Sequence, residues 1–122
     1  MKKIITTLFV AASNTTIDAT MSLMEKGMNT IQKGFFYNSK ELVLEGIEVV
    51  DSANKIFETV DTKDFTKGNR ADQVISNIHG NLAKDLKALR KSTESNKFGS
   101  AAEKYGKVVN DCIACHSVVR GW

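Results

Sequence analysis

Apolar residues recur along this chain at intervals of three and four, the spacing that places them on one face of an α-helix. In the first such segment, 16–33, the stripe consists of Ile17, Met21, Met24, Met28 and Ile31. Further helices are predicted over 39–60, over 70–91, and from a start between 96 and 100 to an end near 120. The chain has no proline, so no residue in it forces these helices to break.

The stripes of the other three predicted helices are equally regular. They comprise Val43, Ile47, Val50, Asn54 and Phe57 in the second helix, Ile75, Ile78, Leu82, Leu86 and Leu89 in the third, and Phe98, Ala102, Tyr105, Val109, Cys112, His116 and Val119 in the fourth. The expected capping pairs are Thr15 with Asp18, Asn38 with Glu41, and Asn69 with Asp72, and Gly34 is expected to end the first helix. Four helices of similar length with short connections predict an all-α fold, an antiparallel (up-down-up-down) four-helix bundle.

The most specific motif is Cys112-Ile113-Ala114-Cys115-His116, which lies on the fourth stripe with six residues after it. In this pattern the two cysteine thiols form thioether bonds to a haem, and the adjacent histidine ligates the iron. A zinc site or a thioredoxin-like redox pair fits less well, because there is no second cysteine pair and no βαβ pattern. A Cys112–Cys115 disulfide would be strained within a helix and would leave His116 without a role. We therefore expect one covalently attached haem c.

Any second iron ligand must come from earlier in the chain. In an antiparallel bundle the end of the fourth helix lies beside the beginning of the first, where Met21 is at the height of His116. Met24 is the second choice, and Met28, further along the axis, is expected in the core. His79, the only other histidine, is a weaker candidate and is more simply interpreted as an exposed or edge residue. If Met21 only packs against the porphyrin, the iron is five-coordinate and can bind small gases.

Arg120 lies one helical turn after His116, so it can reach a haem propionate or, alternatively, interact with the end of its own helix. The order of an aromatic residue, a glycine, a short spacer, CxxCH and an arginine four residues after the histidine resembles the class II cytochromes c. That family includes cytochrome c prime and the low-spin cytochromes of the c-556 type. The residues that carry the resemblance are Tyr105, Gly106, Cys112, Cys115, His116 and Arg120.

The resemblance implies a four-helix haem protein and extends over all four predicted helices. The segment Met21-Ser22-Leu23-Met24 looks like the distal segment of the family, in which low-spin members have a methionine ligand and gas-binding members an apolar side chain. Two positions depart from the family pattern. Val119 stands where an aromatic residue is common, and Ile17 stands where some gas-binding members have a basic residue, so contacts made by those side chains are not carried over.

The first residues have the pattern of a bacterial secretory signal. Lys2 and Lys3 precede an uncharged stretch over 4–12, which is too short to span a bilayer, and a polar run follows. We expect residues 1–12 to be a signal peptide, with cleavage after Ala12 or as late as Ala19, and residues 13–122 to be one haem c domain. Alternatively, this stretch is the start of the first helix. Export would place the protein in the periplasm.

Charge and composition narrow the possible partners. Removing residues 1–12 would remove two lysines and no acids, so the formal net charge of +3 would fall to +1. Lysines interspersed with acids do not favour nucleic acid as a partner, and no membrane anchor is expected. The sequence favours an electron carrier, monomeric or homodimeric, that is not an enzyme and exchanges electrons with partner proteins. The alternative is a protein that binds nitric oxide or another small gas; a peroxidase would have only His79 as an acid–base group.

Overall fold

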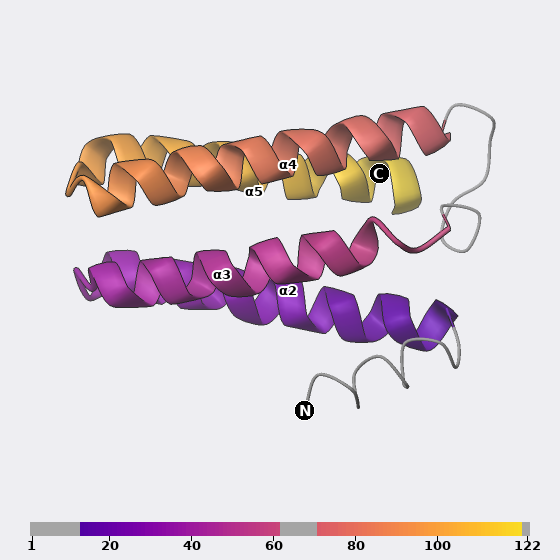
Figure 1. Ribbon diagram of the computed structural model, residues 1–122, viewed down its shortest axis with the longest axis horizontal. Coiled ribbons are helices and arrows are strands. Elements are labelled where there is room, and N and C mark those ends of the chain that lie inside the picture. Colours follow the sequence, from indigo (N-terminus) through magenta and orange to yellow (C-terminus); the bar gives the residue numbers. More distant parts are fainter. Residues whose placement is uncertain (1–12, 62–70, 121–122) are drawn as a thin grey trace.

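The computed structural model describes residues 13–61 and 71–120, with the side chains of 17–61 and 73–119 (Figure 1). This part of the chain contains four α-helices and no strand. They are α2 (Ser13–Phe36), α3 (Lys40–Phe57), α4 (Ala71–Glu94) and α5 (Phe98–Arg120). The predictions of an all-α fold and of four helices are therefore confirmed. The predicted signal peptide and the Asn69 capping position lie outside the described residues.

The α2–α3 turn differs from its prediction by one residue. Asn38 has a positive φ of 51°, a conformation that asparagine adopts more readily than most residues. Ser39 is the N-cap of α3, and its Oγ accepts a hydrogen bond from the Leu42 backbone nitrogen at 3.2 Å. The predicted cap at Asn38 is thus wrong, because that residue supplies the turn instead. At the α4–α5 connection Asn96 has a φ of 60°.

Two predicted ends of the first helix are also wrong. Thr15 and Gly34 both lie inside α2, which runs from Ser13 to Phe36. Gly34 is buried because α3 approaches it closely: a Cβ atom there would lie 2.6 Å from the backbone nitrogen of Val43. The glycine makes room for the neighbouring helix and does not end its own.

The same close approach occurs where Gly27 of α2 meets Gly46 of α3. A Cβ atom on Gly46 would lie 2.6 Å from the carbonyl oxygen of Gly27 and 2.7 Å from the backbone nitrogen of Ile31. Both distances are shorter than real Cβ contacts. The α2 and α3 backbones are therefore nearly in contact, and only glycine fits at this crossing.

The core largely follows the predicted stripes of α3 and α4. The buried members of those stripes are Val43, Ile47, Val50, Asn54, Phe57, Ile75, Leu82, Leu86 and Leu89. The stripe predicted for α5 is wrong in part, because Ala101 and Val108 are fully buried while Ala102 is exposed. Adjacent alanines and valines allow two stripes one residue apart, and the packing of α5 against α4 selects the earlier one.

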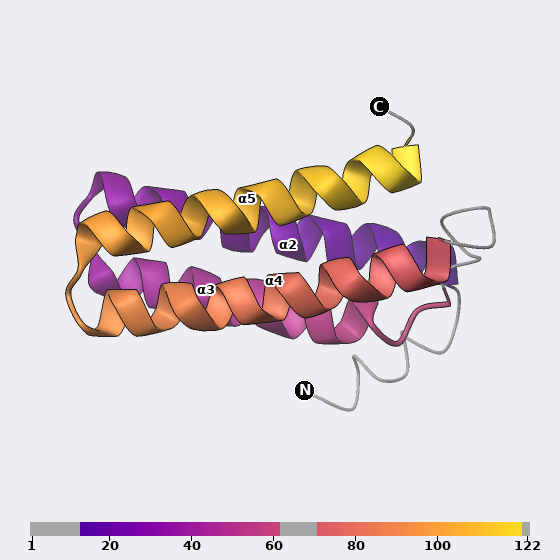
Figure 2. The same ribbon diagram turned by 90° about the horizontal axis from the view of Figure 1, so that it is seen from above.

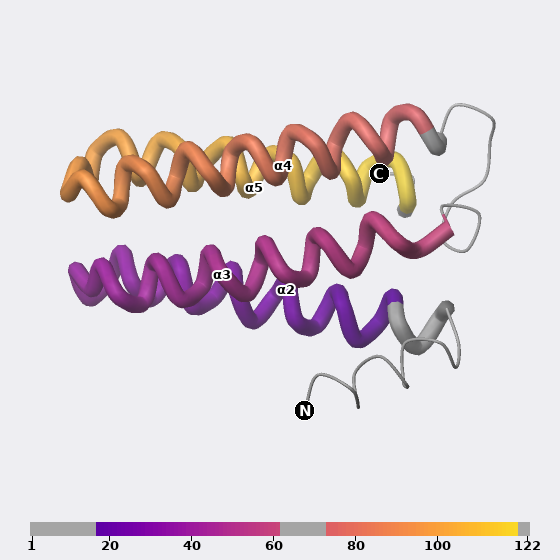
Figure 3. The backbone as a smooth tube through the Cα atoms, in the orientation of Figure 1, coloured from indigo at the N-terminus to yellow at the C-terminus, as the bar shows by residue number. Residues whose placement is uncertain are grey.

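The helices are arranged as two pairs, α2 with α3 and α4 with α5 (Figures 1 and 2). Backbone approaches are extensive within each pair, sparser between α3 and α4, and nearly absent between α2 and α5. The N-terminal halves of α2 and α4 lie at the same end of the molecule as the C-terminal half of α5 (Figure 3). Within the described part, no helix has the length and apolar content needed to cross a bilayer.

Candidate functional site

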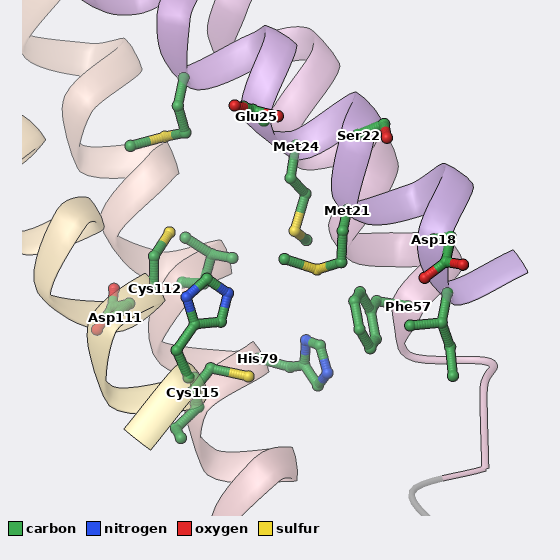
Figure 4. A pocket seen from close by; sticks show the side chains of 15 residues that line it. Asp18, Met21, Ser22, Met24, Glu25, Phe57, His79, Asp111, Cys112 and Cys115 are labelled. Atoms are coloured by element: carbon green, nitrogen blue, oxygen red, sulfur yellow. The ribbon is translucent and has the colours of Figure 1, made fainter. Parts of the chain in front are cut away.

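A cavity of about 670 Å³ lies between the two helix pairs, and all four helices contribute to its wall. Its volume is in the range of small-molecule and cofactor sites. The lining residues are Ile17, Asp18, Met21, Ser22, Met24, Glu25 and Met28 from α2, Phe57 from α3, Ile78, His79 and Leu82 from α4, and Asp111, Cys112, Cys115 and His116 from α5. Figure 4 shows these side chains converging from the surrounding helices. The cavity brings together five of the six residues that the sequence predicts for cofactor binding.

The CxxCH segment lies on α5 with both thiols free. Cys112 and Cys115 are three residues apart, so the helix places them on neighbouring turns of the wall. Burial raises the pKa of Cys112 to about 11, and the charges of Asp111 and Cys115 add to the effect. Burial also raises the pKa of Cys115. Thiols with raised pKa values are unlike the reactive thiols of redox pairs, whose pKa values are lowered.

A zinc site finds no support either. Among the described residues there is no group of three or more His, Cys, Asp or Glu side chains that could hold a metal ion. Structural zinc sites need four such ligands. Neither the thiol redox centre nor the zinc site therefore gains support from the described part of the chain.

The wall opposite α5 contains three thioether side chains from α2. Met24 is 8% exposed, whereas Met21 and Met28 are partly buried. Met28, which we expected in the core, packs against the core and also lines the cavity. Unbranched methionine side chains adapt to irregular contacts, so this wall can adjust to the shape of what packs against it.

His79 is not the exposed or edge histidine that the sequence suggested. It is only 7% exposed and lines the cavity. Its Nδ1 lies 2.6 Å from Oδ1 of Asn54, the Asn54 Nδ2 donates to the His79 carbonyl oxygen at 3.2 Å, and the Phe57 ring lies 5.4 Å away. Burial lowers the pKa of His79, while the Glu58 charge acts in the opposite direction. Asn54 could have predicted the burial of a polar partner, because it is a polar residue within an otherwise apolar stripe and needs a hydrogen-bond partner there.

Asp111 also lines the cavity, although no sequence pattern predicted it there. Its Oδ2 is buried with no hydrogen-bond partner among the described residues. Burial and the neighbouring Asp85 carboxyl raise the pKa of Asp111 to about 7. Periodicity alone could not identify it, because its environment depends on α4.

The charged groups on the described wall are acidic. Asp18 and Glu25 from α2 join Asp111, and the described lining contains no lysine or arginine. Carboxylate groups of a cofactor would therefore need cations from elsewhere. Arg120 is the last residue of α5, one turn after His116, but its side chain lies outside the described ones.

No protein-family model, curated protein or solved structure matches this chain. The functional argument therefore depends on the residues that line the cavity.

Proposed function

We propose that this chain is a periplasmic c-type cytochrome that carries electrons through one covalently bound haem. The observation that carries the proposal is that Cys112, Cys115 and His116 line the same cavity as Met21, although α5 and α2 are distant in sequence. The donor set fits haem c: two thiols for the thioether bonds, an imidazole for one side of the iron and a thioether for the other.

The size of the cavity gives a second, independent argument. The cavity has a volume of about 670 Å³ and opens to solvent, and its wall is mainly apolar. Covering apolar surface removes it from water, which is favourable, so a largely apolar cofactor of this size would stabilise the fold.

The proposal includes the chain topology and the compartment. In an antiparallel, up-down-up-down bundle the end of α5 lies beside the beginning of α2, which agrees with the shared cavity. Residues 1–12 would export the chain, and haem c is normally attached outside the cytoplasm, so the two expectations support each other. The proposed domain is residues 13–122.

Four of the lining residues would hold the haem. Cys112 and Cys115 would attach it covalently, and His116 from α5 and Met21 from α2 would be the iron ligands. A His/Met ligand pair raises the reduction potential. When bound, the haem supplies reversible one-electron transfer at the iron. Arg120 would neutralise a propionate, and the packed core keeps the ligands fixed in both oxidation states.

Absorption spectroscopy of the protein expressed with residues 1–12 tests the proposal. We expect a pigment that stays with the chain in acidified organic solvent, and that is lost when Cys112 and Cys115 are both replaced by alanine. The ferric protein should have a sulfur-to-iron band that disappears in Met21→Leu and persists in the matched variant Met28→Leu. Colourless or extractable material would refute haem attachment, and an unchanged spectrum in Met21→Leu would refute the ligand assignment.

A second candidate is a five-coordinate protein that binds nitric oxide or another small gas. The observation that favours it is the apolar methionine wall, since Met21, Met24 and Met28 could all pack beside the haem and leave the iron open. A high-spin resting spectrum that converts on addition of nitric oxide would select this function. A low-spin spectrum with the sulfur band would reject it.

A further inference from the structure

The Asn54–His79 contact determines which ring nitrogen of His79 carries the proton. The Asn54 Nδ2 donates to the His79 carbonyl oxygen at 3.2 Å, so its Oδ1 is the atom that faces His79 Nδ1 at 2.6 Å. An amide oxygen only accepts, so Nδ1 must carry the hydrogen. Flipping the amide would place its oxygen against the His79 carbonyl oxygen and lose that hydrogen bond, so the orientation with both contacts satisfied is favoured. The ring is therefore the Nδ1–H tautomer, with a lone pair on Nε2.

This arrangement is the one that metal-binding histidines have in proteins. Such residues donate one ring N–H to a fixed acceptor, and the partner fixes the tautomer and the ring orientation. Here the acceptor belongs to the buried stripe of α3, where Asn54 is 1% exposed, and Phe57 packs on the ring. Nε2 of His79 has no hydrogen-bond partner among the described residues. The imidazole is thus neutral, oriented and available for a ligand.

His79 of α4 and Met21 of α2 line the same cavity. The N-terminal halves of these two helices lie at the same end of the molecule (Figures 1 and 2). Figure 4 shows His79 and Met21 entering the space lined by Cys115 and Phe57 from different helices.

We propose that His79 is an alternative iron ligand, which would bind through Nε2 when the Met21 sulfur is not bound to the iron. This inference depends on the proposed haem function. In the exchange the Nε2–iron bond forms as the sulfur–iron bond breaks, and no proton is released because Nε2 carries none. A haem iron with an imidazole in place of a thioether ligand has a lower reduction potential. The chain therefore contains two alternative ligands that would give the haem different reduction potentials.

The test compares holoprotein variants by absorption and electron paramagnetic resonance spectroscopy. Met21→Leu should lose the sulfur band yet remain low-spin with a bis-imidazole signal and a lower reduction potential. Met21→Leu/His79→Gln should be high-spin, because glutamine can still donate to Asn54 but is a poor ligand. External imidazole should restore the low-spin state in this double variant. His79→Gln alone should keep the sulfur band, which controls for folding and haem attachment.

The outcomes separate this inference from the haem proposal. A high-spin Met21→Leu protein with covalent haem would overturn the role of His79 and leave the cytochrome assignment intact. A low-spin Met21→Leu/His79→Gln protein would also overturn it, since another residue would then be the replacement. Chains without covalent haem would refute the proposed function itself. A wild-type bis-imidazole signal that disappears in His79→Gln would also overturn the inference, because His79 would then be the resting ligand and not the replacement for Met21.

Discussion

The crossing of α2 and α3 at Gly46 allows a quantitative test of how the bundle is built. A methyl group at this position would lie 2.6 Å from one backbone atom and 2.7 Å from another. Backbone atoms cannot move aside by changing rotamer, so the helices must separate by about 0.8 Å to reach the 3.4 Å of an ordinary contact. A gap of 0.5–1 Å already removes about a quarter to a half of the dispersion energy of each atomic contact between α2 and α3.

Two opposing terms give the expected size of the effect. Alanine is favoured over glycine by about 1 kcal/mol inside a helix. Overpacking typically costs about 1–3 kcal/mol, and we expect the upper end here because the obstruction is backbone on both sides. Gly46→Ala should therefore lower the free energy of unfolding by about 2 kcal/mol.

Gly106→Ala is the matched control, because this α5 residue is exposed and a Cβ atom there would meet nothing within 4 Å. It should raise the free energy of unfolding by about 0.5–1 kcal/mol. Urea unfolding followed by far-ultraviolet circular dichroism measures both, and the dependence on urea should stay unchanged. Equal midpoints for the two variants would refute the argument that α2 and α3 are in backbone contact.

Three further predictions concern titratable side chains of the cavity. The pKa of His79 is lowered in the folded protein, so the unfolded chain binds more protons at this residue. The free energy of unfolding should therefore fall with acidification below about pH 6.5, the unperturbed pKa. In His79→Gln this part of the pH dependence of the urea midpoint should be absent. The pKa of Asp111 is raised from 3.8 to about 7 in the folded protein, so the contribution of this residue to the free energy of unfolding should fall as the pH rises between these values. Relative to wild type, Asp111→Asn should have a higher urea midpoint at pH 8 but not at pH 3.5. In the chain before haem attachment, the raised pKa of Cys112 predicts that this thiol is alkylated slowly at pH 8 and faster as the pH approaches 11. Fast alkylation of Cys112 at pH 7 would contradict its burial.

The helices could be predicted from sequence because periodic apolar residues and turn-forming residues act locally. The stripe of α3 is one example, since all of its predicted members are buried. Features that depend on a second helix could not be predicted. Gly34 was expected to end a helix, as many glycines do, and only the proximity of Val43 shows why it is buried within one. The burial of His79 likewise depends on Asn54, 25 residues away in sequence.

The α2–α3 and α2–α5 interfaces are packed differently. This difference explains how the chain forms a bundle and also has a cavity. At the α2–α3 seam, glycines bring the backbones together, and the branched side chains of Val43, Ile47 and Val50 fill the remaining volume. Branched residues have few rotamers, so this seam has one arrangement. Between α2 and α5 the wall carries methionines, which are unbranched and polarizable and can repack around a bound group. The iron ligands that we propose would therefore belong to helices that are each held by another neighbour, α3 for α2 and α4 for α5. This division would let the cavity take up a cofactor after folding while the proposed ligands keep their positions.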